Sequence, residues 1–138
     1  MNTSTIRVLA VFGLIATLGP VGAMAQEPAR FAIPFNFTVG HNSLAAGDYL
    51  VREILPNVLQ IQRGDGRSNV LVMAAGVDPG KIQGKVVMTF QKYGDQYFLY
   101  TVKSPDRGLE VPRSVREKEL IAERASPKHF ELIASSRK

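Results

Sequence analysis

The residue types that most often carry catalysis or bind metals are scarce in this sequence. It contains no cysteine, which excludes thiol chemistry and cysteine-ligated metals. Its two histidines, His41 and His129, read as surface residues of a turn and of a final strand. We therefore predict no metal site, no cofactor and no catalytic residue.

The carboxylates and serines have local structural explanations. Four aspartates lie in predicted turns, where the side chain bonds to nearby backbone: Asp48, Asp65, Asp78 and Asp95. A Ser-His-Asp triad stays open because triads assemble in space, but the sequence has no Gly-x-Ser-x-Gly motif. A non-enzymatic protein is the favoured interpretation.

The aromatic residues are the best candidates for binding. Five of them could line a pocket for a lipid, sugar or aromatic ligand in the mouth of a barrel: Phe90, Tyr97, Phe98, Tyr100 and Tyr49. The same side chains could equally form an ordinary core with phenol groups at its rim, which is the default expectation.

The densest aromatic segment, residues 85–103, is predicted to form a β-hairpin around Gly94 and Asp95. A two-residue turn there pairs Phe90 with Leu99. It sends three apolar side chains to the opposite face: Phe98, Tyr100 and Val102. A three-residue loop that includes Tyr93 instead pairs Phe90 with Phe98 on one apolar face. We favour the first register, in which both faces need cover.

Strict alternation of apolar and polar residues predicts the first strand, over 31–39. Its core face would carry five apolar side chains: Phe31, Ile33, Phe35, Phe37 and Val39. Pro34 cannot donate to a ladder, so this strand should lie at an edge or contain a bulge.

Further strands are predicted over 49–54, 58–63, 69–75 and 129–134, with a short extended piece over 109–111. Turns are expected at Pro56 and Asn57 and at Asp65 and Gly66. The second turn, taken as a two-residue loop, places Ile61 opposite Val70 and Leu59 opposite Val72, while Leu71 joins the polar face.

A capping box is predicted at Ser114 and Glu117, followed by a helix over about 115–125 that ends before Pro127. Together these elements predict an all-β fold. We expect a small antiparallel meander barrel or sandwich of about seven strands, with one C-terminal helix near residues 114–125.

The first 25 residues have the pattern of a cleavable bacterial secretory signal. An apolar run over 8–18 is broken by Pro20, and Ala23 and Ala25 supply the small residues that a signal peptidase requires. We expect a single β-rich domain over 26–138, exported to the periplasm or beyond, with no transmembrane segment after cleavage.

Four motifs carry a resemblance to a known group of proteins: FAIPFNFTVG, LAAGDY, KYGDQYFL and GLEVPRSVREKEL. In this order they resemble motifs of short, signal-bearing, β-rich exported proteins of uncharacterised function from soil bacteria. In that group Pro commonly stands where this chain has Ala45, and Leu where it has Val111. The resemblance implies export and one β-rich domain, and it assigns no activity.

Two functions follow as expectations. The first is an envelope or extracellular interaction module, and the second is a carrier of a small apolar, lipid-like ligand. The chain has 17 Lys and Arg against 12 Asp and Glu, and this excess does not gather on one element. Nucleic acid is therefore not an expected partner.

Overall fold

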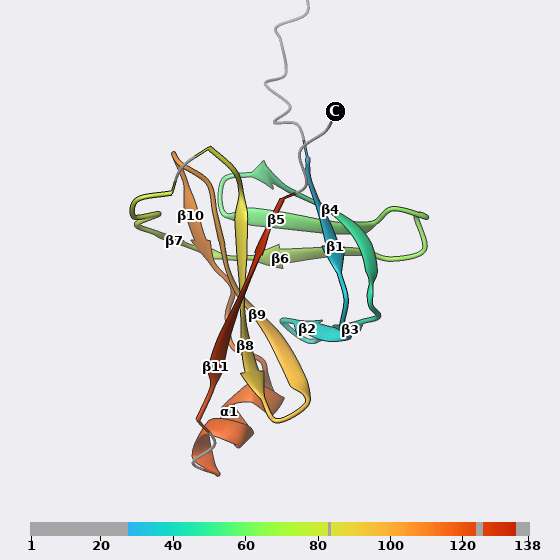
Figure 1. Ribbon diagram of the computed structural model, residues 1–138, viewed down its shortest axis with the longest axis vertical. Helices are drawn as coiled ribbons and strands as arrows, with labels where there is room; N and C mark the ends of the chain where they lie inside the picture. Colours follow the sequence, from blue (N-terminus) through green and yellow to red (C-terminus); the bar gives the residue numbers. More distant parts are fainter. Residues whose placement is uncertain (1–27, 83, 124–125, 135–138) are drawn as a thin grey trace, which may run out of the picture.

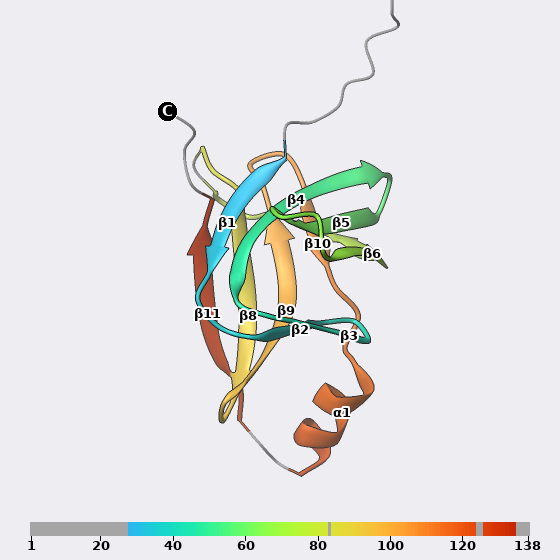
Figure 2. The ribbon, with the colours of Figure 1, turned by 90° about the vertical axis from the view of Figure 1, so that its right-hand side faces the viewer.

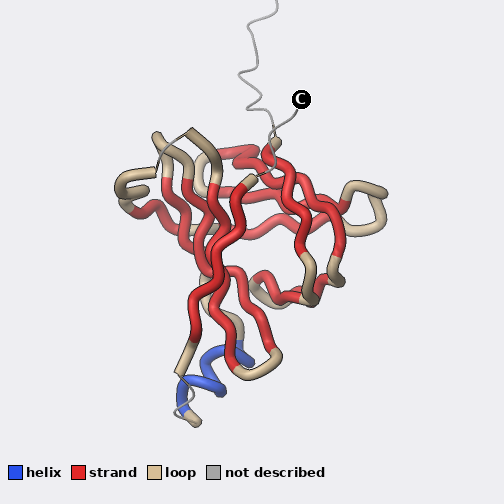
Figure 3. The backbone as a smooth tube through the Cα atoms, in the orientation of Figure 1, coloured by secondary structure: helices blue, strands red, loops and turns tan. Residues whose placement is uncertain are grey.

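The computed structural model describes residues 28–82, 84–123 and 126–134, so the predicted signal segment 1–25 lies outside the described residues. The described residues form eleven strands and one helix, in two sheets around a common core (Figures 1 and 3). The all-β prediction with one C-terminal helix is confirmed. Within the described residues no helix is long and apolar enough to cross a membrane.

The smaller sheet, sheet A, is antiparallel with strand order β1-β4-β5-β6. Its strands are β1 (Ala29–Ile33), β4 (Gly47–Leu55), β5 (Val58–Arg63) and β6 (Asn69–Met73). Asn57, at the β4–β5 turn, has a left-handed φ of 64°, and Leu55 pairs with Val58 across it. The predicted two-residue turn is therefore confirmed.

The larger sheet, sheet B, has strand order β11-β8-β9-β10-β7, with β2 and β3 attached beside β9. Its strands are β2 (Phe37–Val39), β3 (Asn42–Leu44), β7 (Ala75–Val77), β8 (Val87–Tyr93), β9 (Gln96–Lys103), β10 (Gly108–Glu110) and β11 (Lys128–Ile133). The short β2 pairs with β9 in parallel, whereas the other pairings of sheet B are antiparallel. Figure 2 shows both sheets curling around the interior.

The strand predicted over 31–39 is interrupted at Pro34, so the prediction of one continuous strand is wrong. The chain leaves sheet A after Ile33 and joins sheet B at Phe37. Pro34 has no N–H to donate, and the Asn36 side chain at this break accepts from the Ala46 amide at 3.0 Å. The alternation of apolar and polar residues continues where the chain passes from sheet A to sheet B, because Ile33 and Phe37 are both buried.

The segment predicted as one strand over 69–75 also divides between the two sheets. β6 ends at Met73, β7 begins at Ala75, and the Ala74 amide donates to the Asn57 carbonyl at 2.7 Å. The predicted β5–β6 register is confirmed: Ile61 is opposite Val70 and Leu59 is opposite Val72. The connecting loop is longer than two residues, since the Arg63 amide donates to the Ser68 carbonyl at its base.

The central hairpin β8–β9 has the favoured register, with Phe90 opposite Leu99. Thr89 is opposite Thr101, so Tyr100 is an extra residue that forms a bulge. The bulge returns Val102 to the face of Leu99, in the main core, and the prediction that Val102 points the other way is wrong. Phe98 does point to the other face.

The helix α1 (Val115–Ala122) covers the opposite face of the hairpin at its tip. Leu120 and Ile121 of α1 pack against Tyr93 and Phe98 in a second, smaller cluster. Glu123 caps the end of the helix, which is therefore shorter than the predicted 115–125. An apolar stripe this small stabilises the helix only through its contact with the sheet.

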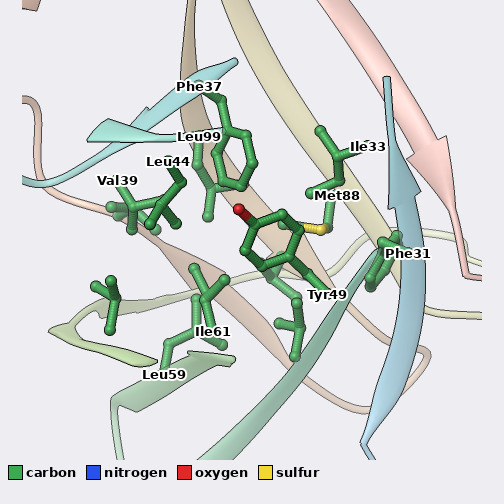
Figure 4. Packing of buried hydrophobic residues seen from close by; sticks show 14 of the residues in the cluster. Phe31, Ile33, Phe37, Val39, Leu44, Tyr49, Leu59, Ile61, Met88 and Leu99 are labelled. Atoms are coloured by element: carbon green, nitrogen blue, oxygen red, sulfur yellow. The ribbon is translucent and has the colours of Figure 1, made fainter. Parts of the chain in front are cut away.

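The main core lies between the sheets. Figure 4 shows Tyr49 of β4 among labelled side chains from both sheets. Phe37 connects the layers, because its ring lies 5.2 Å from that of Tyr49 and 5.6 Å from that of Phe90, both edge to face. The Tyr49 hydroxyl is satisfied by donating to the Ala45 carbonyl at 2.6 Å.

Two methionines give a matched test of this core. Met88 is 0% exposed and Met73 is 74% exposed. We expect Met88→Ala to lower the free energy of unfolding by about 2 to 5 kcal/mol, because it leaves a cavity. In dilute protein, where the chain is monomeric, Met73→Ala should change it by no more than about 0.5 kcal/mol, because the side chain is mostly exposed. Urea unfolding followed by circular dichroism measures both, and equal losses would contradict the placement of Met88.

Candidate functional site

The five aromatic residues predicted to line a pocket are divided between two cores and the surface. Tyr49 and Phe90 belong to the main core, and Phe98 belongs to the cluster beneath α1. Tyr97 is half-buried and stacks on Phe35, with ring centroids 3.7 Å apart. Tyr100 is also half-buried. The structure therefore does not bring these five side chains together around one cavity.

One pocket lies between the sheets, beside the start of β1, and has a volume of about 60 Å³. Its walls are formed mainly by Val51, Leu59, Val102 and Leu109, and none of the five predicted aromatic residues lines it. Small-molecule sites usually have about 300 to 1,000 Å³. This pocket therefore has room for a few water molecules and not for a lipid-like ligand.

A polar clasp at the rim of this pocket joins the two sheets. Arg107, in the loop after β9, donates from Nε and Nη2 to the two carboxylate oxygens of Glu53 on β4, at 3.2 and 3.1 Å. The same Nη2 donates to Asn57 Oδ1 at 2.6 Å. Burial alone would raise the pKa of Glu53, but the bonds from Arg107 and from the Asn57 amide hold that pKa below its ordinary value. The arrangement is that of a structural ion pair.

A buried carboxyl group lies beneath α1. Glu117 is 3% exposed, and its Oε1 lies 3.3 Å from the Tyr93 hydroxyl, which in turn lies 3.0 Å from Gln91 Oε1. The Ser114 hydroxyl accepts from the Glu117 amide at 3.1 Å, so this half of the predicted capping box is confirmed. The Glu117 carboxyl group bonds to Tyr93 instead of returning to the Ser114 amide.

The Tyr93 hydroxyl has two acceptors within reach, Glu117 Oε1 and Gln91 Oε1, and its one proton can be donated to only one of them at a time. Burial raises the pKa of Glu117, against the lowering effects of the Arg113 charge and of the Tyr93 hydrogen bond. Burial, followed by the charge of Glu117, also raises the pKa of Tyr93. Glu117 and the buried Leu120 are three residues apart and so lie on the same side of the helix. This spacing is the feature of the sequence that indicated burial of Glu117.

The two histidines lie on different elements, with His41 exposed in the β2–β3 turn and His129 exposed on β11. Within residues 28–82, 84–123 and 126–134, no group of three or more His, Asp or Glu side chains could hold a metal ion.

The outer face of sheet A carries an exposed cluster that we name the apolar corner: Leu55, Val58, Leu71 and Met73. Leu55, Leu71 and Met73 are 62, 56 and 74% exposed. The strand registers place Leu55 opposite Val58 and Val58 opposite Met73, in one row across three strands. Leu71 precedes Met73 by two residues on the same face, so the four side chains form a continuous surface.

A polar row borders the apolar corner. Arg52 donates from Nε to Gln60 Oε1 at 2.7 Å, and Gln60 donates from Nε2 to Asn69 Oδ1 at 3.0 Å. An apolar centre beside fixed polar groups is the usual anatomy of a protein-binding surface. The sequence held a signal for this site, because the predicted register already placed Leu71 among the polar residues of its strand.

No protein-family model, curated protein or solved structure matches this chain. The resemblance to short exported β-rich proteins therefore stays a prediction.

The Glu117 site leads to a pH-dependent prediction. A raised pKa in the folded protein gives stability that is fully present below the unfolded value of about 4.3 and is lost as pH rises through the folded-state pKa. Glu117→Gln keeps an uncharged side chain. We therefore expect this variant to match the parent near pH 4 and to exceed it in thermal stability at progressively higher pH.

Glu119→Gln is the matched control, because Glu119 lies on the same helix with its side chain 55% exposed. Melting temperatures followed by circular dichroism from pH 4 to 8 measure both variants. A parent that gains stability over Glu117→Gln as pH rises would contradict a raised pKa of Glu117.

Proposed function

We propose that this protein is an exported, non-enzymatic β-domain that binds another protein through the apolar corner, as an interaction module of the envelope or the extracellular space. The observation that carries the proposal is the continuous row formed by the exposed Leu55, the half-buried Val58 and the exposed Met73, with Leu71 beside it. Contiguous apolar surface with a polar border is typical of a docking site.

The energetics of the apolar corner favour a large partner. Leu71 and Met73 keep more than half of their surface in water. Full burial of one such side chain stabilises by about 1.5 to 3 kcal/mol, so several together can support a specific complex. The outer face of a sheet that curls around the core is not concave, so it suits a protein surface better than a small molecule, which binds in a concave site.

The filled interior supports an interaction module over a carrier. A lipid-like ligand needs a continuous apolar cavity, and the pocket between the sheets has about 60 Å³. Of the aromatic residues predicted to line such a cavity, Tyr49 and Phe90 are buried in the main core and Phe98 is buried in the cluster beneath α1. Export is supported by the signal pattern of residues 1–25, with its apolar run and small-residue cleavage site.

Photo-crosslinking tests the proposed docking surface. A photoreactive amino acid replaces Met73 in the full chain, expressed in the cells that naturally produce it. We expect a discrete covalent adduct with a protein, because position 73 projects into the interface. A second substitution, Leu55→Glu, should reduce the adduct at least tenfold, because it buries an unpaired charge.

Two controls accompany this experiment. Gln62→Glu lies on the same face of sheet A but outside the apolar corner and should leave the adduct unchanged. The photoreactive residue at position 131 places the probe on the exposed edge strand β11. Equal adduct yields at positions 73 and 131 would refute the proposed function.

A further inference from the structure

We infer that the protein bound at the apolar corner is a second copy of this chain, which pairs antiparallel with β6 and joins two copies of sheet A into one eight-stranded sheet. The inference rests on the proposed function, since it names the partner of the same surface. Three features of β6 support this partner: its free edge, the composition of that edge and its self-complementarity.

β6 is the last strand of sheet A and pairs with β5 alone (Figure 1). At the two ends of this ladder the Arg63 amide donates to the Ser68 carbonyl, and the Ala74 amide donates to the Asn57 carbonyl. Residues of even number in this segment therefore direct their backbone groups toward β5. By the alternation of an antiparallel ladder, Asn69, Leu71 and Met73 direct theirs to the free edge.

This edge lacks the features that usually keep an edge strand from pairing. Residues 69–77, NVLVMAAGV, contain neither a charged residue nor a proline. The opposite edge of sheet A, β1, carries Arg30 and is stopped by Pro34, and the edge strand β11 of sheet B carries Lys128 and Glu131. Charges and proline are the common protective devices on edges. β6 thus lacks the protection found on the edges β1 and β11, and it is longer than β7, the three-residue uncharged edge at the far end of sheet B.

The same edge suits a two-fold axis. In a symmetric pair, each residue faces its own counterpart or the reciprocal partner, so a charged strand would oppose its own charge. Pairing centred on Leu71 sets Leu71 opposite Leu71 of the copy and Asn69 opposite Met73 of the copy. All the outward-directed amides and carbonyls of Asn69, Leu71 and Met73 are then used in both chains.

This register also brings the β6 part of the apolar corner to the seam, whereas Val58 and Leu55 lie one and two strands away from it. The two Leu71 side chains become direct neighbours on the outer face, and each Met73 lies diagonally beside them, within reach of long side chains. The uncharged strand is complementary to itself, whereas the protein as a whole carries a net charge of +5 that opposes non-specific association of copies. Pairing through β6 places no charged side chain of this strand opposite a like charge of the copy.

Disulfide trapping tests the register directly, because the chain contains no cysteine. Opposed residues of a hydrogen-bonded antiparallel pair have Cα atoms about 5.5 Å apart, which suits a disulfide. We expect Leu71→Cys, in the full chain purified from the producing cells, to oxidise to a covalent dimer. The control Gln62→Cys, on the same face but distant from the edge, should stay monomeric.

Charge exchange gives a second test, measured by analytical ultracentrifugation. We expect Leu71→Lys alone and Leu71→Glu alone to weaken dimerisation at least tenfold, since each opposes like charges across the two-fold axis. An equimolar mixture of the two variants should recover a heterodimer. Circular dichroism confirms that each variant is folded, and recovery in the mixture excludes a simple folding defect.

The outcomes separate the two proposals. A parent chain that stays monomeric, with photo-crosslinks from position 73 to a different protein, would overturn the second copy and leave the proposed function standing. An absence of any adduct at position 73 together with a monomeric parent would overturn both. A trapped dimer with recovery in the charge-exchanged mixture supports both.

Discussion

The structure depends on one constraint: the β8–β9 hairpin carries apolar side chains on both faces, and each face must be covered. Phe90 and Leu99 face sheet A, whereas Tyr93 and Phe98 face the other way. Sheet A closes the first side and α1 closes the second (Figure 2). The helix has few apolar residues, and it is stable here because those residues pack against the second face of the hairpin. The buried Ser114 caps its N-terminus and fixes where it begins.

Much of this arrangement could be predicted from local signals. The Phe90–Leu99 register follows from the turn chemistry of Gly94 and Asp95, and the Leu59–Val72 register follows from apolar alternation. The points where the chain changes sheets could not be predicted in this way. Alternation continues unbroken through Pro34 because both sheets face one core, so a period of two residues cannot reveal which sheet a segment joins.

The remaining errors have the same long-range origin. No glycine, proline or other turn residue at Tyr100 indicates the bulge in the sequence. The bulge is favoured because it brings the Val102 side chain back into the main core. Leu71 could be assigned to the polar face of its strand from sequence, but its position at the margin of sheet A depends on the order β1-β4-β5-β6. The sequence therefore indicated one apolar residue, Leu71, on a polar strand face, but it did not indicate that Leu71 belongs to an exposed apolar surface.

The division of residues 69–77 between two sheets links the filled core to the exposed edge. By leaving sheet A at Ala74, the chain lets β7 pair with β10 and extend sheet B, so no further strand is left to cover β6. Alternation along β6 turns Val70 into the core and Met73 to solvent. β6 is therefore left with β5 as its one partner strand in the described residues, and its free edge, with the outer face of sheet A, is the surface through which we propose that the protein binds.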